Sequence, residues 1–266
     1  TMAITLLILC VTILASKIVP NIAFTGIFQH KRTTRSSSEL CSELFPQNDN
    51  TELRSMFESD GWKNIAENLS SFPLFTIATP ENKPVAYSIT IGTAKGEEKT
   101  FNIPFIYCDV TEALVELEKT QQMTKANKSA DKELKLIPFP LDQAFKLWCD
   151  DRAVIVPSKA SILQAGAPAG TNQIGQKVPL WCCFDVTEEQ EGGLPPKLPL
   201  FMSLEDANAA VLEAVAGDRT KVDDLEVVCL SLDGAIEQLV TVPEESPSFH
   251  FIPPTKSIKY IEDNKI

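Results

Sequence analysis

The chain has 266 residues, of which 44% are hydrophobic and 23% are charged, and its glycine and proline contents are not extreme. This composition is that of a globular protein and excludes an intrinsically disordered or collagen-like chain. Residues 1–38 contain four basic residues and no acidic one, which leaves 20 basic (24 less 4) against 36 acidic residues, a net charge of −16, for the rest. A body this acidic repels nucleic acid and anionic lipid headgroups, so we expect no nucleic-acid partner.

The N-terminal part of the chain has the composition of a targeting sequence. Residues 3–15 form an apolar core that is typical of a signal peptide and short for a membrane span. The small residue Ala23 permits cleavage that would expose Phe24, and the segment after it is basic, hydroxyl-rich and at first free of acids, as in transit peptides. We therefore assign residues 1–23 to a signal peptide and residues 24–45 to a transit-peptide-like segment.

This arrangement resembles the bipartite leader of proteins that enter secondary, red-derived plastids, in which an aromatic residue, usually Phe, directly follows the signal cleavage site. The resemblance implies that Ala23 and Phe24 are the targeting residues and that the protein enters a complex plastid. A plain secretory signal followed by a basic segment is the first alternative. A retained N-terminal membrane anchor is the second.

The rest of the chain contains a diverged internal repeat. Each copy opens with a short apolar run that has Pro near its start, at 72–77 and at 178–184, which predicts a strand. A second Pro-containing strand is expected at 103–108 and at 198–203. The two copies then continue in the same order, with a helix, a strand with a short helix after it, and a last apolar strand.

Helix N-terminal signals follow these strands. Asp109 with Glu112, and Ser203 with Asp206, match the spacing of capping boxes. Further along, the runs 136–142 and 227–233 each predict a strand that ends in an Asp N-cap, Asp142 or Asp233. The runs 154–159 and 251–256 resemble each other as well.

The expected fold class is α+β, with two pseudo-symmetric β-rich repeats and packed helices forming one body. An amphipathic helix is expected at 53–69, before the first repeat, with a possible break at Gly61. We divide the chain into an N-terminal half with the first repeat (46–163), a Gly-, Pro- and Ala-rich linker (164–177) and a second repeat (178–266). Two separate domains are the alternative.

Motifs for catalysis or cofactor binding are absent from the sequence. The glycine-containing segment 170–177 approaches a phosphate-binding loop, but Gln176 separates the second Gly from Lys177 and Val178 replaces the hydroxyl residue. His250 is the only histidine after the leader, which rules out a His-rich zinc site. We expect a protein that is not an enzyme and that has no cofactor, metal or small-molecule substrate; an enzyme of unrecognised type is the alternative.

The order of these elements resembles the Tic22 family, the small soluble subunit of the chloroplast and apicoplast inner-envelope protein translocon. The resemblance rests on the stretches 65–77, 198–212 and 227–239 and covers most of residues 51–260. It implies a chaperone-like role in the envelope intermembrane space, with preproteins, transit peptides and translocon subunits as partners and membrane association only through those partners. A secreted or endomembrane binding protein without a plastid role is the alternative.

Large aromatic side chains gather around the repeated Pro-containing strands. Proline can leave groups at a sheet edge unpaired, and an extended peptide can add to such an edge as a strand. We therefore expect an apolar binding surface for polypeptides. Its candidate residues are Phe72, Phe75, Phe105, Tyr107, Trp181, Phe184 and Phe201.

Overall fold

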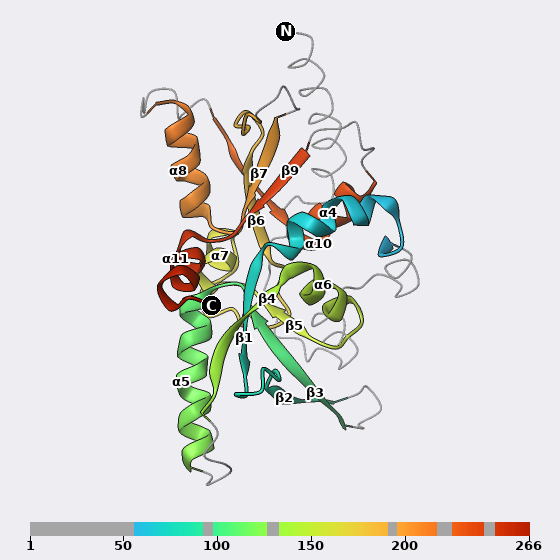
Figure 1. The fold of residues 1–266 in the computed structure, drawn as a ribbon, viewed down its shortest axis with the longest axis vertical. Helices are drawn as coiled ribbons and strands as arrows, with labels where there is room; N and C mark the ends of the chain where they lie inside the picture. Colours follow the sequence, from blue (N-terminus) through green and yellow to red (C-terminus); the bar gives the residue numbers. More distant parts are fainter. Residues whose placement is uncertain (1–55, 93–97, 127–132, 191–195, 217–224, 242–247) are drawn as a thin grey trace.

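The computed structural model describes residues 56–92, 98–126, 133–190, 196–216, 225–241 and 248–266. The leader and its targeting residues Ala23 and Phe24 therefore lie outside the described residues. The described residues form two β-sheets placed one above the other along the long axis of the molecule, with helices on both sides (Figure 1). The α+β class predicted from the sequence is confirmed.

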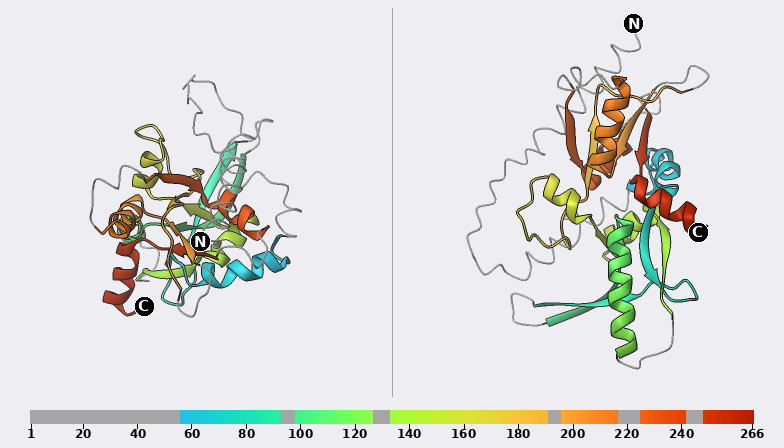
Figure 2. Two further views of the ribbon diagram at one scale, coloured as in Figure 1. Left: turned by 90° about the horizontal axis from the view of Figure 1, so that it is seen from above. Right: turned by 90° about the vertical axis from the view of Figure 1, so that its left-hand side faces the viewer.

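The first sheet has the strand order β2-β3-β1-β4, and β5 pairs with β3. All of its pairings are antiparallel except that of β3 with β5, which is parallel. Strands β2 and β3 form a hairpin that projects away from the body (Figure 2). The strands are β1 (Pro73–Ala78), β2 (Ala86–Gly92), β3 (Glu98–Tyr107), β4 (Lys135–Pro140) and β5 (Val154–Val156).

The second sheet has the order β8-β6-β7-β9 and again has one parallel pair, β7 with β9. Apart from β2, each strand of the first sheet has a counterpart here with the same neighbours and directions: β1 with β6, β3 with β7, β4 with β8 and β5 with β9. The strands are β6 (Pro179–Cys183), β7 (Lys197–Phe201), β8 (Val227–Ser231) and β9 (Ser248–Ile252).

The helices follow the strands in matching positions. Figures 1 and 2 show α5, α7, α8 and α11 on one side of the sheets and α4, α6 and α10 on the other. Helices α5 and α8 follow β3 and β7, α6 and α10 follow β4 and β8, and α7 and α11 follow β5 and β9. The helices are α4 (Asp60–Ser70), α5 (Val110–Ala126), α6 (Leu141–Cys149), α7 (Lys159–Gln164), α8 (Leu204–Ala214), α10 (Leu232–Val240) and α11 (Thr255–Asn264).

The largest core cluster takes side chains from both sheets. Leu74 of β1, Leu180 of β6 and Leu200 of β7 are buried in it together with Phe145 of α6. A second cluster lies between the first sheet and α5, and a third between the second sheet and α8. Because helices cover both faces, β6 is buried at every position and β1 at every position but its first. This explains why these strands do not alternate between apolar and polar residues, Thr76 of β1 being their one polar side chain.

Helix α4 closes the shared core against both halves. Its Trp62 stacks on Phe145 of α6 with ring centroids 6.1 Å apart, and its Leu69 is fully buried. The helix begins at Asp60, with the hydroxyl of Ser59 accepting a hydrogen bond from the Trp62 N–H at 3.1 Å. Gly61 therefore lies in the first turn and does not interrupt the helix. Positions 53–55 of the expected helix lie outside the described residues.

The two helix N-caps predicted after β3 and β7 are confirmed. Asp109 accepts from the backbone N–H of Thr111 at 2.7 Å and from that of Glu112 at 3.1 Å, and Ser203 accepts from Asp206 N–H at 3.3 Å. These bonds satisfy N–H groups that have no partner inside their own helix.

The N-caps predicted at Asp142 and Asp233 are wrong. Helices α6 and α10 begin two residues earlier than these N-caps predict, so both carboxylates lie inside the first turn. The N-caps are Pro140, which makes no side-chain cap bond, and Ser231, whose hydroxyl accepts from the Gly234 N–H. The helices start early because the strand ladder runs directly into them.

The described cysteines are free thiols, and all but the partly buried Cys229 are buried. They act as small apolar side chains of the core. Within the described ranges, the structure has no helix that combines the length and the apolar character required to cross a bilayer.

Gly61→Ala tests the contact of α4 with the second half of the chain. A Cβ atom on residue 61 would lie 1.8 Å from the carbonyl oxygen of Val240, so α4 must move away from α10. We expect the free energy of unfolding, measured by urea denaturation, to fall by roughly 1–3 kcal/mol. Asn64→Ala, at an exposed position of the same helix, is the control, and equal stability of the two variants would contradict this packing.

Candidate functional site

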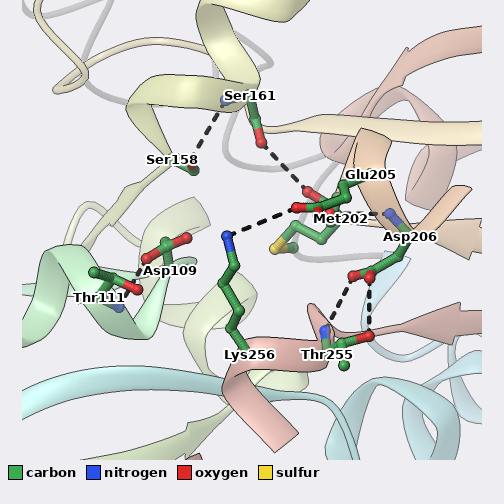
Figure 3. A network of polar contacts seen from close by, with 10 residues as sticks. Asp109, Thr111, Ser158, Ser161, Met202, Glu205, Asp206, Thr255 and Lys256 are labelled. Carbon is green, nitrogen blue, oxygen red and sulfur yellow. Dashed lines mark hydrogen bonds and ion pairs between the residues drawn. The ribbon is translucent and has the colours of Figure 1, made fainter. Parts of the chain in front are cut away.

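A pocket of about 230 Å³ lies where the two halves of the chain meet (Figure 3). Its walls come from the ends of β3 and β7, where Cys108 and Met202 lie, and from the first turns of α7, α8 and α11. Counterpart elements of the two halves thus face each other across it. Figure 3 shows the polar side chains of these helix starts directed toward the same space.

An acidic residue of each half holds the start of a later helix of the same half. The carboxylate of Asp206, in α8, accepts from Thr255 N at 3.0 Å and from Thr255 Oγ1 at 2.8 Å, at the start of α11. In the first half, the carboxylate of Glu112, in α5, accepts from Lys159 N at 2.8 Å, at the start of α7. The predicted capping boxes are therefore corrected, because their acidic members bond to another helix.

Glu112 also binds the segment between the halves. The side-chain amide of Gln173 donates to its carboxylate and, at 2.8 Å, to the carbonyl oxygen of Pro157. Burial raises the pKa of Glu112, and the hydrogen bonds from Lys159 and Gln173 oppose this shift in part. The segment predicted as a linker is thus attached to the junction by a partly buried polar contact.

The last helix of each half contacts the other half. Tyr260 of α11 places its ring edge-on to Phe75 of β1, with centroids 5.9 Å apart. Ala165, directly after α7, packs against the cluster beneath α8, and the Ser161 hydroxyl of α7 donates to the carbonyl oxygen of Met202 at 3.4 Å. These exchanged contacts join the halves at the pocket.

The pocket has no activated nucleophile among its described residues. Cys108 is fully buried, and burial raises the pKa of its thiol far above the ordinary value, so the thiol stays neutral. The carboxylates of Asp109 and Asp206 are already engaged with helix starts. No group of His, Cys, Asp and Glu among the described residues could hold a metal ion. The polar contacts around the pocket stabilise the junction between the two halves.

The predicted apolar binding surface is corrected by the burial of its residues. Phe72, Phe75, Tyr107, Trp181 and Phe201 are buried in the core. Phe75 lies opposite Tyr107 in the first sheet, and Trp181 lies opposite Phe201 at the equivalent position of the second. These five aromatics therefore fill the clusters beneath the helices and do not form an exposed surface.

The other two candidates, Phe105 and Phe184, are partly buried. Phe105 stacks on Tyr87 of the hairpin with centroids 4.6 Å apart, and the Tyr87 hydroxyl lies 3.2 Å from Thr120 Oγ1 of α5. Phe184 packs at the edge of the shared core. The structure does not bring the seven side chains together at one place.

Sequence reasoning missed the apolar side chains that are exposed. In α5, Val115 is 50% exposed and Met123 is 66% exposed. Helix α5 packs on the core through Val110, Ala113 and Leu117. Val115 and Met123 do not follow the helical spacing of these residues, and this was the signal in the sequence that could have predicted their exposure. The helices on this side of the sheets carry the exposed residues Leu114, Val115, Met123, Leu163, Leu212 and Ile258.

These features define a class of α+β protein in which two sheets of like topology share one core and exchange terminal helices. No protein-family model and no curated protein sequence matches the chain. Among solved structures, Tic22 from Plasmodium falciparum is 19% identical, with a TM-score of 0.55, over 76% of this chain and 97% of that one. Anabaena Tic22, described as a protein of protein transport, is 19% identical, with a TM-score of 0.56, over 76% of this chain and 96% of that one. The chain therefore has the Tic22 fold.

Glu112→Gln tests the partly buried carboxylate at the junction. The folded protein holds this proton more tightly than the unfolded chain, whose Glu pKa is near 4.5, so the wild type loses stability as pH rises past that value. We expect the variant to gain stability relative to wild type between pH 4 and pH 7, as measured by urea denaturation at several pH values. Glu118→Gln, an exposed carboxylate of the same helix, is the control; parallel pH profiles for wild type and Glu112→Gln would contradict the assignment.

Proposed function

We propose that this protein is a member of the Tic22 family and a component of plastid protein import. The observation that carries the proposal is the likeness to two Tic22 structures over nearly their whole length, from organisms as distant as Plasmodium and Anabaena. The matching order of Pro-containing strands and capped helices in the sequence supports it independently. We further propose that the two halves are pseudo-symmetric copies of one ancestral unit, which their equal strand orders support.

We place its site of action in the intermembrane space of the envelope of a red-derived plastid. The support is the leader, in which an apolar core, Ala23 and Phe24 precede a basic, hydroxyl-rich segment. In this proposal, cleavage after Ala23 exposes Phe24 for recognition at the plastid. Membrane association then takes place through translocon subunits.

Its task is the chaperone-like binding of preproteins in transit. The exposed apolar residues of α5, α7, α8 and α11 supply contact area for extended apolar segments, in place of the seven buried or partly buried aromatics. The net charge of −16 attracts basic, acid-free transit peptides and keeps such a surface soluble. The exposed apolar residues and the negative charge favour the same class of partner, an unfolded polypeptide that begins with a basic segment.

The binding test mixes residues 39–266 with a fluorescent transit peptide or a denatured client and titrates salt. We expect binding that weakens with salt, because its electrostatic part is screened, and that retains a salt-resistant apolar part. Val115→Ser with Met123→Ser should reduce only the salt-resistant part, whereas Thr111→Ser, at an exposed polar position of the same helix, should change neither. Absence of both peptide binding and suppression of client aggregation would reject the proposal.

The targeting test uses Phe24→Ala in a fluorescent fusion of the full chain. If Phe24 is read after cleavage at Ala23, the variant fusion should fail to enter the plastid and should accumulate outside it. Phe28→Ala, within the same segment, is the control, because it removes an aromatic residue at a distance from the cleavage point. Plastid entry of the Phe24→Ala fusion at the wild-type level would overturn the role of Phe24, and secretion of the wild-type fusion would overturn the localisation.

A further inference from the structure

The two sheets differ at one pair of equivalent edges. Strands β4 and β8 are outer strands at corresponding positions, each antiparallel to a central strand, β1 or β6. Among the described residues, no strand pairs with the other edge of either. The backbone groups along that edge decide whether a further strand can be added.

The hydrogen bonds between β4 and β1 show which backbone N–H and C=O groups of β4 point outward, away from β1. The N–H of Leu141 donates to Phe72 O at 3.0 Å directly beyond the strand, and hydrogen-bonded pairs alternate along an antiparallel ladder. Because the backbone groups of Leu141 point toward β1, those of the residue before it, Pro140, point away. The same holds for every second residue before Pro140, which are Pro138 and Leu136. Two of these three residues have no N–H, so β4 is a poor template for a new strand.

Backbone groups alternate in the same way between inward and outward directions along β8. The N–H of Leu232 donates to Val178 O at 2.9 Å, so the backbone groups that point away from β6 belong to Ser231, Cys229 and Val227. Ser231 is only 4% exposed, but Cys229 and Val227 are partly exposed and both have an N–H group. Their spacing of two residues is that at which one edge of a neighbouring strand forms its hydrogen bonds.

Two exposed carboxylates lie near one end of this edge. Glu226 directly precedes β8, and Asp185 lies two residues beyond the end of β6. Because Cys183 of β6 pairs with Val227 of β8, both acidic residues are at the Val227 end. The charge there favours a basic chain over an acidic one.

We propose that the outer edge of β8 binds an extended, basic, acid-free polypeptide segment as an additional strand. The inference rests on the proposed function and names the place at which the basic part of a preprotein binds. The backbone of Val227 and Cys229 provides the hydrogen bonds, and Glu226 and Asp185 select for positive charge. The equivalent edge of β4 is closed by Pro138 and Pro140, so each molecule takes one such segment on this pair of edges.

The first arm of the test transfers the proline of β4 to β8. Cys229→Pro places in β8 the residue that β4 has at the equivalent position, Pro138, and removes one outward N–H. Cys229→Ala removes the thiol and keeps the N–H. With the full chain and a short fluorescent peptide in which Lys and Arg alternate with Thr and Val, anisotropy should show binding weakened by about tenfold in Cys229→Pro and by less than about twofold in Cys229→Ala.

The second arm leaves the protein unchanged, so it holds even if Cys229→Pro does not fold. Two versions of the peptide carry N-methyl groups on alternate residues, one on the odd and one on the even positions, and each loses the N–H groups of one strand edge. Strand addition predicts that one version binds like the unmodified peptide and that the other is weakened by about tenfold. Equal binding of both versions, or of Cys229→Pro and Cys229→Ala, would overturn the β8 edge and leave the proposed function standing. No binding of the unmodified peptide would overturn both.

Discussion

Two β-sheets bury one face each in the same apolar core, and most other features of the molecule depend on this burial. Leu74, Leu180 and Leu200 come from different strands of the two sheets and are shielded from water by one another and by α4, α6 and α10. Burial of each such side chain contributes on the order of 1.5–3 kcal/mol, and neither sheet could cover its face alone. The position of α4, against α6 of one half and α10 of the other, follows from the same requirement.

The exchange of terminal helices adds a second connection between the halves. Helix α11 packs on the first sheet through Tyr260, while the turn after α7 packs beneath α8. The start of each exchanged helix is held by a carboxylate from its own half, Glu112 or Asp206. A backbone N–H in the first turn of a helix has no partner inside its own helix. These carboxylates provide that partner and fix the helices at the junction.

The equivalent edges of the two sheets have diverged in a way that the core does not require. Pro138 and Pro140 close the outer edge of β4, whereas β8 presents N–H groups at the matching positions. An apolar edge strand is a hazard for aggregation unless it is protected or used. This difference between the two edges is the observation from which the proposed addition of a strand at β8 is argued.

The sequence by itself determined the local structure. Pro-containing apolar runs marked the central strands, and Asp109 and Ser203 marked helix starts, because capping depends on a side chain and backbone groups only a few residues apart. The residue at which a strand passes into a helix depends on more distant contacts. Asp142 and Asp233 resembled N-caps, but both helices begin two residues earlier than those N-caps predict.

Only the tertiary structure decided which apolar side chains are hidden. In a sheet covered on both faces, every position of a strand such as β6 can be buried, so aromatic residues like Phe75 and Trp181 show nothing in sequence that separates core from surface. Three features depend on segments distant in the chain: the exposure of Val115 and Met123, the hydrogen bond from Gln173 to Glu112, and the outer edge of β8, with which no described strand pairs. Those contacts exist only once both halves have packed together, and local patterns therefore cannot specify them.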